Sequence, residues 1–124
     1  EIYATGANSR AIISYGDLVG IVAPQVVAVG GAAVEWGAGV IGLDPLYASA
    51  TDVHLQSRHG RWDPAARRFV TTDLNNSHCI DAGDPEDPVG SEQIPNGCRI
   101  NLGAYGGTAQ ASISVEAGTI FSVW

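Results

Sequence analysis

Residues 25–41 read QVVAVGGAAVEWGAGVI, two short apolar runs separated by a pair of glycines. The run Gln25–Val29 is apolar on both faces, and strands of that kind lie between covered layers, as parallel strands usually do. No run up to residue 43 keeps helical spacing beyond two turns, and tight Asn-Gly or Asp-Gly hairpin signals are missing there. We therefore expect short parallel strands joined by glycine-rich corners, over the runs Glu1–Ala4, Ala11–Tyr15, Val19–Ala23, Gln25–Val29, Ala32–Trp36 and Gly39–Ile41.

The composition fits one globular, turn-rich domain. Of the 124 residues, 45% are hydrophobic, 15% are charged and 16 are glycine, whereas disordered chains are richer in charge and poorer in aliphatic residues. The net charge of −7 argues against a nucleic-acid partner, and no apolar stretch approaches the roughly 18 residues that a membrane span needs. All six cations are arginine, and an acidic, lysine-free chain suits an extracellular, calcium-containing setting.

The second half of the chain is polar and rich in turns. Arg61-Trp62 and Phe69-Val70 flank a turn opened by Asp63-Pro64, which predicts a β-hairpin with Trp62 facing Phe69. Between Asn75 and Gly107 almost no run could form regular structure, so something other than a strand ladder must hold that loop. The alternation in Ser112–Glu116 predicts a half-exposed strand, and Thr119–Trp124 a second one.

Four motifs follow one another in this half: Asp44-Pro45-Leu46-Tyr47, Val53-His54-Leu55-Gln56-Ser57, Cys79-Ile80-Asp81-Ala82-Gly83-Asp84-Pro85 and Leu102-Gly103-Ala104-Tyr105-Gly106-Gly107. The insert Gly60-Arg61-Trp62-Asp63-Pro64 and the upstream segment Ile13-Ser14-Tyr15-Gly16-Asp17-Leu18 fit the same pattern. Together they resemble the C-terminal segment of secreted bacterial right-handed parallel β-helix repeat proteins, which often carry a surface anchor. The resemblance covers nearly the whole chain up to Ser112. Two departures, Val19-Gly20-Ile21-Val22 for the usual glycine pair and Cys98 for a frequent glycine, suggest an altered corner and an added cross-link.

The resemblance implies an all-β fold, the last rungs of a right-handed parallel β-helix followed by a loop-rich C-terminal cap. We expect terminal rungs over residues 1–56, a cap with the hairpin and a disulfide-closed acidic loop over 57–111, and C-terminal strands over 112–124. The chain begins at Glu1 without a methionine, so we expect a processed product, a fragment or an incompletely traced protein. Two rungs alone are marginally stable, and we therefore expect upstream β-helix rungs or another copy of the chain as a partner.

Four carboxylates, those of Asp81, Asp84, Glu86 and Asp87, crowd into one turn-rich loop. Calcium takes six to eight oxygen ligands, and a tight acidic loop with its backbone carbonyls could supply most of them. Alternatively, Asp81 and Asp84 cap turns through their side chains while the other two are solvated. The spacing does not match an EF-hand loop, which favours the second interpretation.

Cys79 and Cys98 bracket this loop. A disulfide between them would close about twenty residues and contribute on the order of 3 kcal/mol in the chain-entropy model. Without a second pair or neighbouring histidines they make a poor zinc site, and nearby acids do not suit a catalytic thiol. We predict a disulfide, with two buried thiols as the alternative.

Four of the six arginines lie close together, with aromatic and histidine residues between them. Arginine grips carboxylate or sulfate with two hydrogen bonds, and tryptophan stacks on sugar rings, so an acidic polysaccharide is one candidate ligand. A solvated hairpin is the plainer interpretation and the one we favour. The candidate glycan-binding residues are Arg58, Arg61, Trp62, Arg67 and Arg68.

No catalytic residue can be assigned from the sequence. A Gly-X-Ser-X-Gly elbow, a P-loop and a His-Glu-X-X-His motif are all missing, and fold alone does not select a function. We expect a non-catalytic structural or adhesive end of an extracellular surface protein. Two alternatives stay open: the terminal part of a polysaccharide lyase-like β-helix enzyme whose active site lies upstream, and a self-assembling extracellular filament subunit.

Overall fold

The computed structural model describes residues 2–18 and 26–114, which form eight strands and no helix, and the all-β prediction is confirmed. None of these residues belongs to a helix that could cross a membrane. The chain divides into two compact units, Glu1–Asp44 and Pro45–Trp124. We call them the N-terminal unit and the C-terminal unit and describe each by itself.

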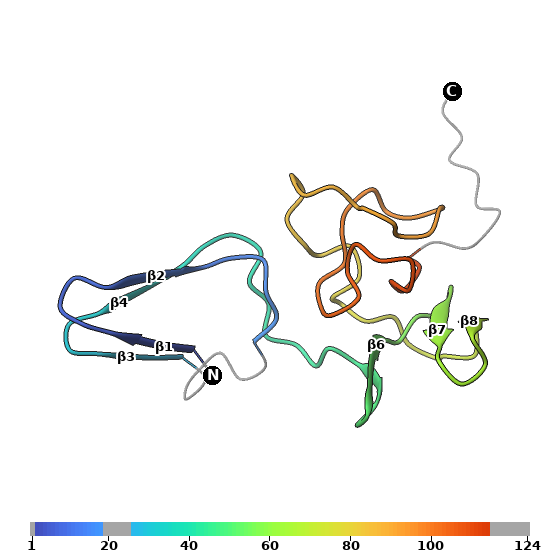
Figure 1. The fold of residues 1–124 in the computed structure, drawn as a ribbon, viewed down its shortest axis with the longest axis horizontal. Coiled ribbons are helices and arrows are strands. Elements are labelled where there is room, and N and C mark those ends of the chain that lie inside the picture. Colours follow the sequence, from blue (N-terminus) through green and yellow to red (C-terminus); the bar gives the residue numbers. More distant parts are fainter. Residues whose placement is uncertain (1, 19–25, 115–124) are drawn as a thin grey trace. The chain divides into compact units, whose positions relative to one another are not determined.

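The N-terminal unit contains two pairs of parallel strands. Strand β1 (Ile2–Thr5) pairs with β3 (Val26–Val29), and β2 (Arg10–Ile13) pairs with β4 (Ala33–Trp36) (Figure 1). The expected parallel pairing is therefore confirmed for these strands. Of the other expected runs, Gly39–Ile41 makes only a bridge from Ile41 to Asp17, and Val19–Ala23 lies outside the described residues.

The pairing keeps a nearly constant offset along the chain. Ile2 pairs with Val26, and Arg10 with Ala33, an offset of about 24 positions, as expected when one repeat contacts the next. Hydrogen bonds at the corners continue the series: the Ala33 N–H donates to Ser9 O at 2.9 Å, the Gly37 N–H to Ile13 O at 2.7 Å and the Tyr15 N–H to Ala38 O at 2.9 Å. Residues 2–18 therefore run alongside residues 26–41 through strands and corners alike.

One corner of this unit requires glycine. Gly39 has a φ of 71°, and a Cβ built on it would lie 2.3 Å from Cδ1 of Tyr15. Both the left-handed backbone and the close approach of the ring exclude a side chain there. The glycine-rich composition of this stretch thus allows its corners to lie close together.

Side chains along strand β2 alternate between exposed and half-buried positions. Arg10 and Glu35 form an ion pair on the exposed face of β2 and β4, whereas Ala4 on β1 is buried. Ala4 is also the only buried apolar side chain among residues 2–18 and 26–44. The described part of this unit therefore has a small apolar core, although it contains four strands.

The C-terminal unit begins with an antiparallel strand pair. Strand β5 (Tyr47–Ser49) pairs with β6 (Asp52–Leu55) across a tight turn, and the Gln56 N–H donates to Leu46 O at 2.9 Å. Residues 45–56, expected to belong to the parallel rungs, instead fold back on themselves. The boundary between compact units accordingly falls after Asp44 rather than after residue 56.

The predicted hairpin is confirmed. Strand β7 (Arg61–Asp63) pairs antiparallel with β8 (Arg68–Val70), and Trp62 lies opposite Phe69 with ring centroids 5.5 Å apart. Asp63 shapes the turn because its Oδ1 accepts the Ala65 N–H at 2.9 Å.

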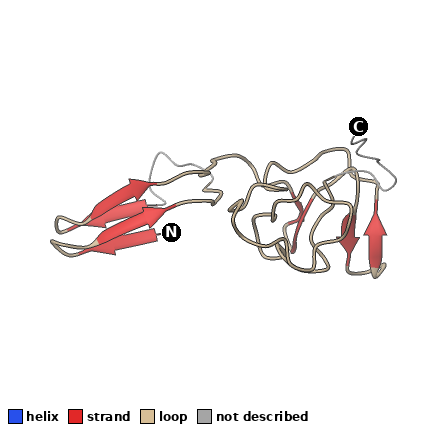
Figure 2. Ribbon diagram, turned by 90° about the horizontal axis from the view of Figure 1, so that it is seen from above, coloured by secondary structure: helices blue, strands red, loops and turns tan. Residues whose placement is uncertain are grey.

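Residues 71–114, the last described part of the C-terminal unit, consist of loops and turns (Figure 2). The expected absence of regular structure between Asn75 and Gly107 is confirmed. Residues 112–114 form no strand, so the strand predicted from Ser112 does not begin there. Residues 115–116 and the predicted strand Thr119–Trp124 lie outside the described residues.

Candidate functional site

Buried polar side chains, rather than a strand ladder, hold the loops of the C-terminal unit together. Only three apolar side chains of its described residues are buried, those of Leu55, Cys79 and Ala111. More polar or charged side chains than apolar ones are buried in this unit: His54, Ser57, Ser77, Glu92, Asn101 and Ser112. Buried polar groups persist where their hydrogen bonds are satisfied, and all of these side chains except that of His54 bond to backbone groups of distant segments.

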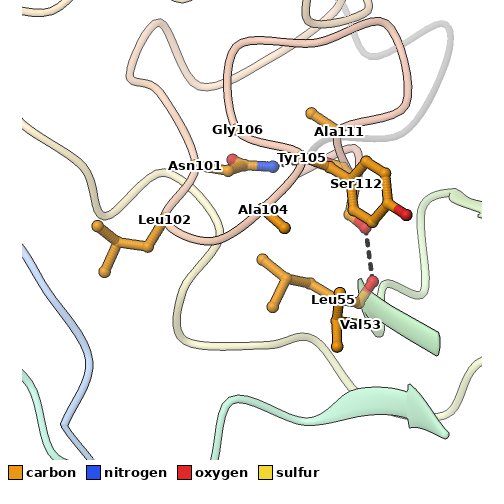
Figure 3. A pocket seen from close by; sticks show the side chains of 9 residues that line it. All are labelled: Val53, Leu55, Asn101, Leu102, Ala104, Tyr105, Gly106, Ala111 and Ser112. Atoms are coloured by element: carbon orange, nitrogen blue, oxygen red, sulfur yellow. Dashed lines mark hydrogen bonds between the residues drawn. The ribbon is translucent and has the colours of Figure 1, made fainter. Parts of the chain in front are cut away.

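Asn101 connects three segments of this core. Its Oδ1 accepts the Asp81 N–H at 2.8 Å, its Nδ2 donates to Ser112 O at 2.8 Å, and its own N–H donates to Glu92 Oε1 at 2.8 Å. Ser112 extends the connection by donating from Oγ to Leu55 O at 2.5 Å (Figure 3). The segments around residues 55, 81, 92, 101 and 112 are thus linked through a few side-chain atoms.

His54 is the most enclosed ring of the unit, with 1% of its surface exposed. It stacks on Tyr105 with ring centroids 3.6 Å apart and 9° between the planes. Its Nδ1 lies 2.5 Å from Asp52 Oδ1, and its Nε2 lies 3.2 Å from Gln110 Oε1. An ionised carboxylate can only accept, so Nδ1 carries the proton shared with Asp52.

Arg61 continues this network on the other side of Asp52. Its guanidinium grips Asp73 with two hydrogen bonds, Nε to Oδ2 at 2.8 Å and Nη2 to Oδ1 at 3.2 Å, and Nη1 lies 3.8 Å from Asp52 Oδ2. Asp73 Oδ2 also accepts the Ser57 N–H at 3.0 Å. We call the set of His54, Asp52, Arg61 and Asp73 the charged network.

The charged network shifts the ionisation of two of its members. Burial by itself raises the pKa of Asp52, but hydrogen bonds from the His54 N–H and ring, with the charges of His54 and Arg61, outweigh it and lower that pKa. The hydrogen bond to Asp73 raises the pKa of Arg61 above its usual value against an opposing effect of burial, with further help from the charges of Asp73, Asp52 and Asp63. The network is therefore built to keep Asp52 ionised.

His54 is sealed from solvent, with 1% of its surface exposed. A cavity of about 10 Å³ lies among Val53, Leu55, Tyr105, Ala111 and their neighbours (Figure 3), which is room for about one water molecule. Proton transfer to a substrate would need an accessible ring nitrogen, and His54 is sealed by its partners. We therefore assign the charged network a role in stabilising the fold of this unit.

The four carboxylates of the acidic loop do not converge. Asp84 Oδ1 accepts the Glu86 N–H at 2.9 Å, the arrangement of an aspartate that caps a turn, and Glu86 and Asp87 are exposed. Asp81 keeps a buried Oδ1 that has no hydrogen-bond partner in the described chain. Within residues 2–18 and 26–114, no group of three or more acidic, histidine or cysteine side chains is placed to share a metal ion. Calcium binding by this loop therefore stays a prediction.

No disulfide joins Cys79 and Cys98 in the structure. Cys79 is buried, with its N–H donating to Ser77 Oγ at 3.1 Å, whereas Cys98 is exposed in a left-handed conformation with a φ of 60°. The Cys98 N–H donates to Asn96 Oδ1 at 2.9 Å, in a turn that keeps this residue at the surface. The arrangement differs both from the predicted disulfide and from the alternative of two buried thiols.

The five candidate glycan-binding residues are divided between two environments. Arg61 is held inside by Asp73, and Trp62 is half-buried against Phe69. The other three, Arg58, Arg67 and Arg68, are exposed. Of the five candidates, these three arginines are therefore the ones most open to a ligand at the surface.

A larger and more open hollow lies along residues 87–98, with a volume of about 520 Å³. Pro88, Val89, Ile94 and Pro95 form its apolar lining, and Asp87 and Glu92 are its two acidic members. The sequence assigned Asp87 to the calcium loop and did not single out Glu92. From the sequence alone, a single glutamate in a turn-rich stretch is expected to be exposed to solvent, and no local pattern indicates that Glu92 is buried.

No protein-family model matches this chain, and searches among curated proteins and solved structures likewise found no match.

Proposed function

We propose that this chain is a non-catalytic structural or adhesive segment of an extracellular right-handed parallel β-helix protein. The observation that supports this most is the offset of about 24 positions between paired residues, kept through two strand pairs and the corners between them. In this proposal residues 2–18 and 26–41 are two stacked coils, and further coils continue the stack. The extracellular setting rests on the acidic, lysine-free composition and on the sequence motifs.

The edge of strand β2 that faces away from β4 is the surface on which another coil would pair. Ser9 O and Ile13 O accept hydrogen bonds from the second coil, and successive residues of a strand direct their backbone groups to opposite sides. Arg10 and Ile12 therefore direct their N–H and C=O groups away from β4. An exposed edge of this kind is a template for a further strand, supplied by preceding sequence or by a second copy.

Sedimentation velocity over a range of concentrations tests whether a second copy of the chain pairs with this edge. The wild-type chain should associate as its concentration rises, and Ile12→Pro should weaken that association because proline removes an edge N–H while sparing the bonds to β4. A chain that stays monomeric at every concentration would contradict pairing between copies, and association unchanged by Ile12→Pro would place the contact elsewhere.

Contact with an acidic polysaccharide is a second proposed function, supported by the exposure of Arg58, Arg67 and Arg68. Polygalacturonate is a suitable probe because it presents repeated carboxylates that arginine binds. Arg67→Ala combined with Arg68→Ala should abolish retention on immobilised polygalacturonate, with Arg10→Ala as the control for a lost positive charge. Retention that survives the double substitution, or that never occurs, would contradict this function.

A further inference from the structure

The hollow along residues 87–98 is held open by turns on both sides. The Ser91 N–H donates to Gly107 O at 2.9 Å, and the Glu92 N–H donates to Val89 O at 3.3 Å. Farther along, Asn96 donates from Nδ2 to Gln93 O at 3.3 Å. The volume of the hollow, about 520 Å³, lies within the range of small-molecule sites. The segment thus forms a preorganised concave surface rather than a loop that must fold around a ligand.

Glu92 gives this hollow its chemistry. The residue lines the hollow and is 7% exposed. Its Oε1 accepts the N–H groups of Asn101 at 2.8 Å and Gly107 at 3.0 Å. In the part of the chain that the structure describes, Oε2 makes no hydrogen bond, and no arginine or histidine forms an ion pair with this carboxylate. A ligand cation beside this largely buried carboxylate would form a charge-assisted hydrogen bond with Oε2.

The remaining lining favours a ligand with an apolar body. Ile94 has 89% of its surface exposed although it is a large aliphatic residue, and Pro88, Val89 and Pro95 extend the apolar lining around it. Asp87 adds a second acid, and no basic residue lines the hollow. Charge and shape therefore select a cation attached to a hydrophobic group, and they disfavour an anion.

We propose that this hollow binds a small organic cation, a primary ammonium group on an apolar body, with the ammonium on the Glu92 carboxylate and the body against Ile94 and Pro95. The ammonium donates to Oε2 and gains further attraction from Asp87. Oε1 keeps its two backbone donors, so binding leaves the hydrogen bonds of the core intact. This site lies in the C-terminal unit and does not depend on the proposed stacking of coils.

Isothermal titration with 2-phenylethylammonium, compared with neutral 2-phenylethanol, tests the proposal. The ammonium should bind at least about tenfold more tightly, since a charge-assisted hydrogen bond is stronger than a neutral one. Glu92→Gln should remove that preference, because glutamine keeps one oxygen as an acceptor for the two backbone N–H groups and removes the negative charge. Glu86→Gln is the matched control, since it removes the same charge from an exposed neighbour that does not line the hollow.

A second pair of measurements covers the case in which Glu92→Gln fails to fold. Ile94→Ser changes an exposed side chain, so it should preserve the fold and weaken binding of the ammonium at least about threefold, by loss of apolar area. The ammonium should also slow maleimide modification of Cys98, which is exposed and lines the same hollow. Equal affinities for the two compounds, or an Ile94→Ser variant that binds as well as the wild type, would overturn the proposal.

Discussion

At the scale of single residues, the C-terminal unit depends on side chains that each bond two or more backbone groups. Asn101 is the clearest case: at 5% exposure it satisfies the Asp81 N–H and the Ser112 C=O at once. Such a residue replaces the strand ladder that these loops lack. Its loss would leave a donor and an acceptor buried without partners.

We therefore expect Asn101→Ala to lower the free energy of unfolding by about 2–4 kcal/mol, since each buried polar group left unsatisfied costs about 1–3 kcal/mol. Urea denaturation followed by tryptophan fluorescence measures it. Asn75→Ala, at an exposed position, is the control and should stay within about 0.5 kcal/mol of the wild type. Equal effects of the two substitutions would mean that the buried amide does not hold the loops.

The second residue-scale prediction concerns acid. Because the pKa of Asp52 is lower in the folded than in the unfolded chain, its ionisation stabilises the fold above its unfolded pKa of about 3.9, and this contribution is lost as the pH falls through the folded pKa. Asp52→Asn should reduce the free energy of unfolding at pH 7, and the difference from the wild type should shrink below about pH 4. Urea melts at both pH values test this. A difference that is constant with pH would argue against the charged network.

At the scale of elements, the sequence predicted what depends on local pattern. Runs that are apolar on both faces predicted the parallel strands. The turn signal Asp63-Pro64 predicted the β7–β8 hairpin with Trp62 opposite Phe69. The antiparallel pair β5–β6 was missed because residues 45–56 were assigned to the parallel rungs. The buried roles of Glu92 and Asn101 were missed for another reason: each is fixed by partners distant in sequence.

Two proline substitutions in neighbouring positions of β2 should have different effects. Ala11 directs its N–H toward β4, since Ser9 O and Ile13 O face that strand and alternate residues share a side. Ala11→Pro should therefore remove strand signal from far-ultraviolet circular dichroism, whereas Ile12→Pro should retain it. Retention of the signal in both variants would mean that β2 and β4 do not pair as described.

At the scale of the whole molecule, the placement of the acidic loop carries a prediction about metal. Because Asp81, Asp84, Glu86 and Asp87 do not converge, addition of a calcium chelator should leave the midpoint of thermal unfolding unchanged. Differential scanning calorimetry of the full chain with and without chelator makes the comparison. A clear fall in the midpoint would support the calcium interpretation of this loop.

The stacking of the two coils is the central claim, and a cross-link tests it most directly. Thr5 pairs with Val29, and neighbouring strands about 4.8 Å apart lie within the span of a disulfide. In a Cys98→Ser background, Thr5→Cys with Val29→Cys should cross-link on mild oxidation, whereas Thr5→Cys with Ala33→Cys, a pair from strands that are not partners, should not. Mass spectrometry of the digested chain identifies the bond. Cross-linking of the first pair alone would support the stack, and equal or absent cross-linking in both pairs would contradict it.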